Sequence, residues 1–535
     1  MARTFKLESR SAAGGIDWSA ELNKEQLAVV TAPGGPMLVV AGAGSGKTRA
    51  LTYRLAWLVC HGADPSRIML VTFTNRAARE MLSRVELLVK QQTKDLWGGT
   101  FHHIANRLLR QYGSALGIQP DFTILDREDA KDLLATCVHE AGVDTNTRRF
   151  PQKSVLAAIS SFIQNTLEPL ETVITRRYPM FIHEATEIER VMVLYSSKKA
   201  HRQLLDYDDL LSAWLRLLTE HKDIRERLAE QFQHILVDEY QDTNAIQGAI
   251  VDLLASRHRN LTVVGDDSQS IYSFRGATFE NIISFNHRYP DAIEYRLETN
   301  YRSTPEILTL ANASVACNRR RLPKELRSQR PSGLKPAIVP VQDHFVQSRF
   351  IAEYILHLLV SHYDGANLRK EDIKGLTNFA AQYNTVEAFL TDVALAGEFS
   401  GETVVTGPEE QEFVILSTIH QAKGLEWPIV FIPWLADGRF PTDLAINTQE
   451  DLEEERRVFH VAVTRAKDEV YLIVPQMYAN RSRSLVMMKP SRFLTELSQD
   501  LTEPMRLEEG LPYLVSGQPP KALPDPNPGL QDDPF

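Results

Sequence analysis

The length, composition and charge of the chain exclude several classes of protein. The chain has 535 residues, of which 43% are apolar and 24% charged, and its formal net charge is −10. This length exceeds what one hydrophobic core can organise, so roughly two to four domains are expected. The acidic balance excludes a protein that coats nucleic acid over its whole surface and leaves only a local groove for such a partner.

No segment has the composition of a membrane span or a secretory signal. No apolar run approaches the roughly 20 residues that a bilayer span needs, and Met1–Lys6 lacks the apolar core of a signal peptide. Cys60, Cys137 and Cys317 are far apart and show neither metal-site spacing nor a disulfide framework. A cytoplasmic enzyme without a membrane partner is the simplest interpretation.

Taken in chain order, residues 1–20 are predicted to be a flexible leader, and apolar runs alternate with helical patterns from Leu22 onward. Runs this apolar are typical of strands that are buried on both faces of a parallel sheet. An α/β fold is therefore expected. The predicted strands are Met37–Val40, Ile68–Phe73, His234–Val237, Leu261–Val264, Phe413–Thr418, Ile429–Ile432 and Val470–Val474.

The distribution of these patterns divides the chain into domains. No strand is evident between about Asn106 and Trp214, where helices are predicted over Asp129–Ala141, Lys153–Gln164 and His183–Leu205. Residues 106–214 are therefore predicted to be a helical insertion in a first α/β domain (21–105 and 215–300). The second domain is predicted over 301–372 and 413–500, interrupted by 373–412, and residues 501–535 are predicted to be a disordered, acidic, proline-rich tail.

The segment Ala41–Thr48 reads Ala-Gly-Ala-Gly-Ser-Gly-Lys-Thr and lies between a predicted strand and a predicted helix. A phosphate-binding loop requires this context, because backbone N–H groups of the turn converge on phosphate oxygens. Lys47 would reach the β- and γ-phosphates of ATP, and Thr48 would hold Mg²⁺. The alternative is an ordinary glycine-rich turn. The predicted nucleotide-binding residues of this loop are Ala43, Gly44, Ser45, Gly46, Lys47, Thr48 and Arg49.

Two adjacent carboxylates, Asp238 and Glu239, follow the strand His234–Val237. Asp238 is expected to bind Mg²⁺, and Glu239 is expected to orient or deprotonate the attacking water. The alternative is a solvated acidic turn. The later loop Val264–Gly276 carries Gln269, which is suited to sensing the γ-phosphate.

The same loop contains aromatic and basic side chains that suit a nucleic acid. Tyr272 and Phe274 are suited to stacking on bases, and Arg275 follows them. Base stacking is tolerant of sequence, because every base has a π-face. The alternative is that both aromatic side chains belong to the core.

Several blocks together resemble the UvrD/Rep/PcrA group of superfamily 1 DNA helicases. Besides the loop and the carboxylates, the blocks occur in family order from about residue 20 to residue 475. They are Leu22–Gln26, Thr72–Met81, Gly99–His102, Leu297–Ser303, Thr418–Glu426 and Val461–Lys467. The resemblance implies two RecA-like domains, called 1A and 2A, with the helical insertion 1B in the first.

The resemblance also implies roles for individual residues. Gln26 and Tyr301 would hold adenine, and Arg302 and Arg465 would reach the γ-phosphate from the second domain, with Glu426 at the nucleotide edge. For Arg465 the alternative is a surface arginine on a charged helix. His420 is left unassigned. Including the loop residues above, the implied single-strand contacts are Phe73, Asn75, His102, Tyr272, Phe274 and Arg275.

The resemblance implies an ATP- and Mg²⁺-dependent motor that moves 3′ to 5′ on single-stranded DNA and separates duplex, with DNA junctions and repair proteins as candidate partners. A monomer or weak dimer is expected. One departure is that the helical insertion 2B of the relatives is nearly absent, since only 373–412 remains. A DNA-stimulated translocase that unwinds little and a non-catalytic DNA-binding remnant therefore stay open.

One further basic run, Arg319–Arg327, has two interpretations. It could grip DNA phosphates, which would add a salt-dependent contribution to affinity. It could also be a solvated loop or helix face, which is the more common outcome.

Overall fold

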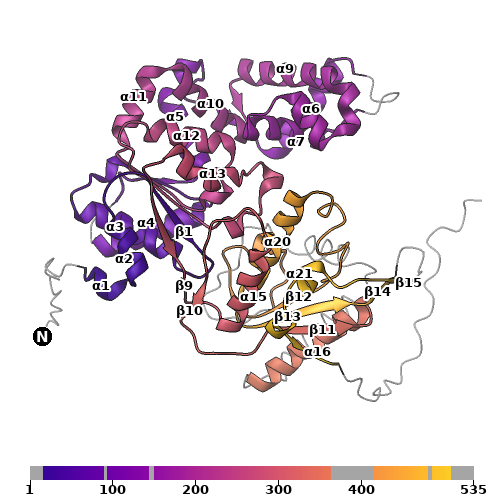
Figure 1. The fold of residues 1–535 in the computed structure, drawn as a ribbon. Coiled ribbons are helices and arrows are strands. Elements are labelled where there is room, and N and C mark those ends of the chain that lie inside the picture. Colours follow the sequence, from indigo (N-terminus) through magenta and orange to yellow (C-terminus); the bar gives the residue numbers. More distant parts are fainter. Residues whose placement is uncertain (1–15, 90–92, 144–149, 363–413, 480–484, 508–535) are drawn as a thin grey trace, which may run out of the picture.

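The computed structural model describes residues 16–89, 93–143, 150–362, 414–479 and 485–507. Its larger sheet has six parallel strands in the order β3-β2-β6-β7-β1-β8. Figure 1 shows this sheet at the left, below a lobe of helices. The strands are β1 (Met37–Ala41), β2 (Ile68–Val71), β3 (Trp97–Gly99), β6 (His234–Val237), β7 (Leu261–Gly265) and β8 (Ile293–Leu297).

The larger sheet is buried on both faces, as its continuous apolar strands predict. In β1, Leu38 and Val40 pack in one cluster, while Met37 and Val39 pack in another on the opposite face. Each fully buried side chain of this kind contributes about 1.5–3 kcal/mol. Helices α5 (Phe101–Tyr112), α10 (Tyr207–Glu220) and α12 (Ala245–Ala255) cover the first face, and α3 (Lys47–Cys60) and α4 (Asn75–Val89) cover the second.

A separate helical lobe lies at the top of Figure 1 and has its own core. It contains α6 (Arg127–Glu140), α7 (Lys153–Thr166), α8 (Leu170–Arg177) and α9 (Ala185–His201). The predicted limits of the insertion, 106 and 214, fall inside α5 and α10, which pack on the first sheet. Two short strands, β4 (Thr123–Ile124) and β5 (Leu204–Leu205), pair within the stretch where none was expected.

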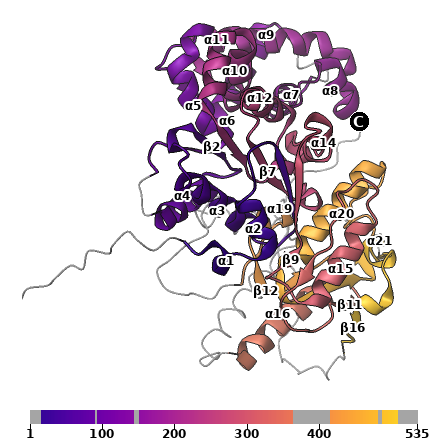
Figure 2. The same ribbon diagram turned by 60° about the vertical axis from the view of Figure 1, so that its left-hand side comes forward.

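The second sheet has four parallel strands in the order β12-β13-β11-β16. They are β12 (Trp427–Ile432), β13 (Ala466–Pro475), β11 (Ala337–Val341) and β16 (Glu503–Pro504). Helices α15 (Pro305–Ala316) and α20 (Gln449–Val463) lie side by side on one face, as Figure 2 shows. Helix α16 (His344–His362) packs on the other through Phe350.

The remaining α-helices and strands of the described chain are smaller elements. They are α1 (Trp18–Glu21), α2 (Lys24–Val30), α11 (Lys222–Gln231), α13 (Glu280–Ile283), α14 (Phe285–Arg288), α19 (Ile419–Ala422), α21 (Arg492–Thr495), the pair β9 (Thr299–Asn300) and β10 (Arg327–Ser328), and the hairpin β14 (Met477–Ala479) with β15 (Leu485–Met487). None of the described helices is long and apolar enough to cross a membrane.

Three predictions about the course of the chain are corrected. Residues 414–418 of the predicted strand Phe413–Thr418 form no strand and are exposed, because an apolar run does not by itself supply a pairing partner. The leader ends before α1, whose Trp18 ring packs against Tyr53 and Trp57. The predicted tail begins too early, since β16 pairs with β11; residues 508–535 and the segment 373–412 lie outside the described residues.

Candidate active site

The glycine-rich turn after β1 has the backbone geometry of a phosphate-binding loop. Gly44 and Gly46 have φ values of +66° and +81°, which glycine adopts readily and other residues rarely adopt. Gly46 is the N-cap of α3, and no side chain caps this end of the helix. The N-terminal N–H groups of α3 are therefore left for an anion, which the helix dipole also favours.

Lys47 and the two carboxylates after β6 meet at this loop. The Lys47 Nζ lies 3.6 Å from the Glu239 Oε1, and its side chain is 11% exposed. Glu239 itself has a positive φ of 49°, a backbone conformation that is uncommon for a non-glycine residue and recurs at functional sites. Among the residues that the structure describes, neither the Lys47 Nζ nor the Asp238 Oδ1 has a hydrogen-bond partner.

The two carboxylates differ in their ionisation. Burial, together with the charge of Glu239, raises the pKa of Asp238 to about 7. Burial also opposes the ionisation of Glu239, but Lys47 and Lys423 outweigh it and lower the pKa of that carboxyl. Glu239 is therefore the more acidic member of the pair in this arrangement. A carboxyl with a raised pKa and an unpartnered oxygen beside a phosphate loop fits a site for a hard cation.

Gln269 lies in the turn after β7 and is buried, with 3% exposure. Its Nε2 donates to the Asp266 Oδ2. Asp266 also accepts from the Ser268 N–H and is fully buried. The structure thus ties Gln269 to a carboxylate that was not among the predicted site residues.

The predicted arginines lie in the second domain where it meets the first, since Arg302 lies beside Gly44 and Glu239 acts electrostatically on Arg465. The Arg302 Nε donates to the Glu426 Oε2 at 2.6 Å. Arg465 is 2% exposed and donates to the carbonyls of Val461 at 2.9 Å and Leu425 at 3.1 Å. Burial and then Arg302 lower the pKa of Arg465 to about 9, so the guanidinium keeps its charge at neutral pH. The alternative of a surface arginine is excluded by this burial.

Gln26 and Tyr301 both contact the phosphate loop. The Gln26 Nε2 donates to the Ser45 carbonyl at 3.1 Å, and the Tyr301 N–H donates to the Gly44 carbonyl at 3.0 Å. The Tyr301 ring is 49% exposed. Arg49, in contrast, points to Glu21, whose carbonyl and carboxylate it contacts at 2.7 and 2.8 Å. Thr48 is half-buried at the start of α3.

Lys423 joins the two domains and was missed by sequence reasoning. Its Nζ donates to the Gln269 carbonyl at 2.6 Å and pairs with Asp242, both in the first domain. Burial raises the pKa of Asp242 to about 6 although Lys423 opposes this. The position of Lys423 between Thr418 and Glu426 was the available signal, since it lies inside a motif already singled out.

Four aromatic side chains gather where the two domains meet. Phe73 stacks on Tyr272 with ring centres 5.1 Å apart, and Tyr272 lies 6.0 Å from Phe274. His420 of α19 lies 5.2 Å from Phe274. Phe73 and Phe274 are 43% and 50% exposed, so the reading of Phe274 as a core residue does not hold. The cluster follows the carboxyl ends of β2 and β7, where parallel sheets bind ligands.

The remaining predicted contacts are more scattered. Asn75 is exposed at the first residue of α4, and the side chain of Arg275 lies outside the described part of the chain. His102 lies on α5, and its ring is 5.9 Å from the ring of Tyr207, the first residue of α10. Tyr207 is 52% exposed. Burial lowers the pKa of His102, so the imidazole is neutral at pH 7. Tyr207 was missed because nothing in its sequence context distinguishes it from a core aromatic.

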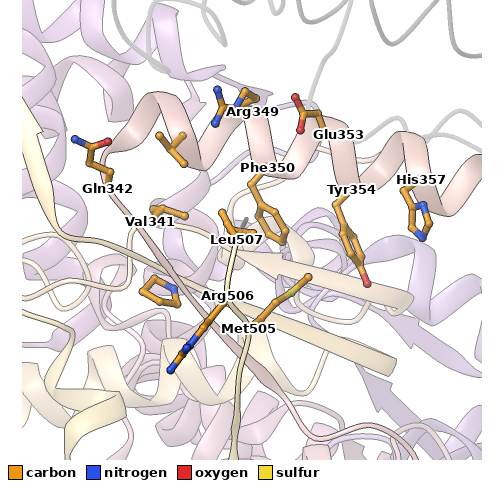
Figure 3. A pocket seen from close by; sticks show the side chains of 12 residues that line it. Val341, Gln342, Arg349, Phe350, Glu353, Tyr354, His357, Met505, Arg506 and Leu507 are labelled. Atoms are coloured by element: carbon orange, nitrogen blue, oxygen red, sulfur yellow. The ribbon is translucent and has the colours of Figure 1, made fainter. Parts of the chain in front are cut away.

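A cavity of about 390 Å³ lies away from all of these residues, between β11, α16 and residues 505–507. Figure 3 shows the Phe350 and Tyr354 side chains of α16 at its wall, opposite Met505 and Leu507. None of its lining residues is a predicted site residue. The charged groups described above converge where the two domains meet, and not at this cavity.

Comparison with known proteins decides the family. Residues 22–290 match the UvrD/REP helicase N-terminal domain, and residues 369–477 match the UvrD-like helicase C-terminal domain. The chain belongs to the UvrD/REP helicase family. The α/β fold, the family and the helicase class of enzyme expected from the sequence are confirmed.

Curated relatives match over nearly the whole chain. The chain is 30% identical to the ATP-dependent DNA helicase PcrA of Bacillus subtilis, covering 90% of this chain and 86% of the relative. It is 28% identical to the protein of that name from Leuconostoc citreum, covering 90% and 85%. The Bacillus alignment spans 648 positions against 535 residues here, so at least 113 positions are gaps in this chain. The relatives therefore carry sequence that this chain lacks.

Proposed function

We propose that the chain is an ATP-dependent DNA helicase that moves along single-stranded DNA. One observation carries the proposal: the Lys47–Glu239 pair of the first domain lies within electrostatic range of the buried Arg465 of the second domain. Glu239 acts electrostatically on both Lys47 and Arg465, so the three charges lie close together where the two domains meet. The relatives named ATP-dependent DNA helicase PcrA support the same activity.

The first domain holds the nucleotide in this proposal. Backbone N–H groups of Ala43 to Gly46 and the Lys47 ammonium bind the phosphates, and Gln26 with Tyr301 borders the adenine. Thr48 and Asp238 hold Mg²⁺, which neutralises phosphate charge when it is bound. Glu239, kept ionised by Lys47 and Lys423, accepts a proton from the attacking water.

The second domain completes the site. Arg302 and Arg465 stabilise charge that develops on the γ-phosphate, and Glu426 holds Arg302 in place through its 2.6 Å hydrogen bond. Because Arg465 is fixed by backbone carbonyls, its guanidinium can change position only when the second domain moves. Hydrolysis therefore depends on how the cleft is closed.

Single-stranded DNA lies across the aromatic cluster of Phe73, Tyr272, Phe274 and His420, with Asn75, His102 and Arg275 as further contacts. Lys423 lies beside this cluster, with its Nζ 5.1 Å from the centre of the Tyr272 ring, and it also holds Asp242 and Gln269. One side chain thus borders both the base-stacking surface and the nucleotide site. This contact gives the bound strand a physical route to the chemistry.

The Phe274→Ala variant is expected to bind single-stranded DNA about 5- to 150-fold more weakly, because a base–aromatic stack contributes about 1–3 kcal/mol. The ring is half-exposed and contributes little to the hydrophobic core, so the melting temperature should change little. Fluorescence anisotropy with a labelled oligonucleotide measures the affinity. Phe345→Ala, which removes a 71% exposed ring from another surface, is the matched control. Equal affinities of both variants and the wild type would contradict this path.

We propose movement in the 3′ to 5′ direction from the family resemblance. Three further properties remain predictions: repair proteins as partners, a cytoplasmic location, and a monomer or weak dimer. Duplexes with a 3′ or a 5′ single-stranded tail test direction and unwinding together. Unwinding of the 3′-tailed duplex alone is expected. If the chain uses ATP to displace a bound protein from single strands but does not separate a duplex, the translocase alternative is favoured. The alignment positions that this chain lacks are the reason to consider that alternative.

A further inference from the structure

The basic run Arg319–Arg327 does not face solvent as a whole, because the side chain of Lys324 within it is buried. The Lys324 side chain is 4% exposed. Its Nζ lies 2.8 Å from the Asp266 Oδ1 and 2.8 Å from the Ser268 Oγ, and it also pairs with Asp267. A lysine that sequence places at the start of the second domain thus ends inside the first domain.

Asp266 and Gln269 depend on this ammonium. Asp266 is fully buried, and besides Lys324 it accepts from the Ser268 N–H and the Gln269 Nε2. Burial alone would raise the pKa of Asp266, but Lys324 acts together with Lys47 and His460 to outweigh burial and to hold that pKa far below its usual range. Without Lys324 the buried carboxylate would lose its paired charge and would tend to take up a proton. The acceptor that fixes the Gln269 amide would then be weaker.

The segment that carries Lys324 is anchored to the helix that precedes Arg465. The Asn318 Nδ2 donates to the Glu453 carbonyl of α20 at 3.0 Å, and the Arg319 N–H donates to the Glu453 Oε1 at 3.0 Å. The Arg456 Nη1, also on α20, donates to the Asn318 Oδ1 at 2.8 Å. Any displacement of α20 relative to the first domain therefore pulls on the segment that holds Lys324.

We propose that Lys324 is a positioning residue that fixes Asp266, and through it Gln269, according to the placement of α20 and Arg465. The γ-phosphate-sensing amide and the arginine from the other domain are then set by one mechanical connection. The inference rests on the proposed function, because it assigns a control element to the same ATP site. It differs from the contact made by Lys423, which reaches the Gln269 carbonyl and not its side chain.

The Lys324→Met variant keeps the aliphatic stem and removes the charge. We expect kcat for DNA-stimulated ATP hydrolysis to fall by about 10²-fold, because misplacing a reacting-site group by about 1 Å costs that much. KM for ATP and the affinity for an oligonucleotide should stay within about threefold of the wild type. Arg327→Met, which removes a 69% exposed cation from the same segment, should leave all three unchanged.

A double-mutant cycle separates positioning from a general structural effect. If Lys324 acts through Gln269, adding Lys324→Met to Gln269→Ala should cause no further loss of kcat. A multiplied loss in that background, or normal hydrolysis by Lys324→Met, would overturn the inference alone. A wild-type chain that hydrolyses no ATP would overturn the proposed function as well.

The buried carboxylates left by Lys324→Met could prevent folding, so a second variant keeps the inference testable. Lys324→Met combined with Asp266→Asn removes one buried charge of each sign and should fold with a cooperative thermal transition. Its kcat should match that of Gln269→Ala, because the amide has lost its charged acceptor. Wild-type kcat in this folded double variant would overturn the inference.

Discussion

Lys47→Ala is expected to reduce ATP hydrolysis by about 10³-fold, the size of effect seen when a preorganised group that stabilises transition-state charge is removed. Lys47 is the ammonium at the N-terminus of α3, it is 11% exposed, and it lies 3.6 Å from Glu239. No neutral side chain can supply its charge to the β- and γ-phosphates. The aromatic cluster lies on other elements, so binding of single-stranded DNA without nucleotide should persist.

The measurement is steady-state phosphate release with saturating oligonucleotide, together with oligonucleotide affinity by anisotropy. Lys222→Ala, which removes a lysine that is 76% exposed on α11, is the matched control and should behave as the wild type. Hydrolysis retained by Lys47→Ala would contradict the assignment of the phosphate loop. Loss of both activities together with a lowered melting temperature would point to misfolding, which the thermal transition detects.

Arg465→Lys is expected to reduce kcat by about 10³- to 10⁵-fold, as removal of an arginine finger does. The substitution keeps a positive charge but loses the planar donor set, which at present holds two backbone carbonyls and the Thr464 hydroxyl. An ammonium cannot make these bonds and reach a phosphate at the same time. ATP binding to the first domain should be affected far less than turnover.

A fluorescent ATP analogue measures binding, and single-turnover hydrolysis measures the chemical step. Arg176→Lys, at a helix position that is 69% exposed, is the control for the same chemical change. Wild-type turnover by Arg465→Lys would show that Arg465 supplies no essential guanidinium. The proposal that both domains contribute charges to one ATP site would then be wrong. Comparable loss of binding and turnover would assign Arg465 to ground-state binding instead.

The first sheet was predictable because its strands are buried on both faces. Four of its six strands, β1, β2, β6 and β7, consist mostly of apolar residues. The other two strands lie at the sheet edges and lack that signal. β3 reads Trp-Gly-Gly, and β8 mixes charged and apolar residues. The short β16 depends on pairing with β11, a tertiary contact that local patterning cannot reveal.

The candidate site was predictable where the chemistry is local. The phosphate loop and the Asp238–Glu239 pair each place their residues within a few positions of the sequence. Lys324 and Lys423 could not be assigned in this way, because their partners Asp266 and Asp242 lie 58 and 181 residues away. Arg49 is predicted to contact the nucleotide because it is close to the loop, and in the structure its side chain bonds to Glu21.

The most direct test of the central claim is the rate of ATP hydrolysis by the full chain with and without single-stranded DNA, in the presence of Mg²⁺. Because Lys423 connects the proposed ATP site to the aromatic cluster, we expect the oligonucleotide to stimulate ATP hydrolysis strongly. We also expect hydrolysis to be lost when EDTA removes the cation. Hydrolysis that is absent, or that is the same with and without DNA, would contradict an ATP-driven motor on single strands.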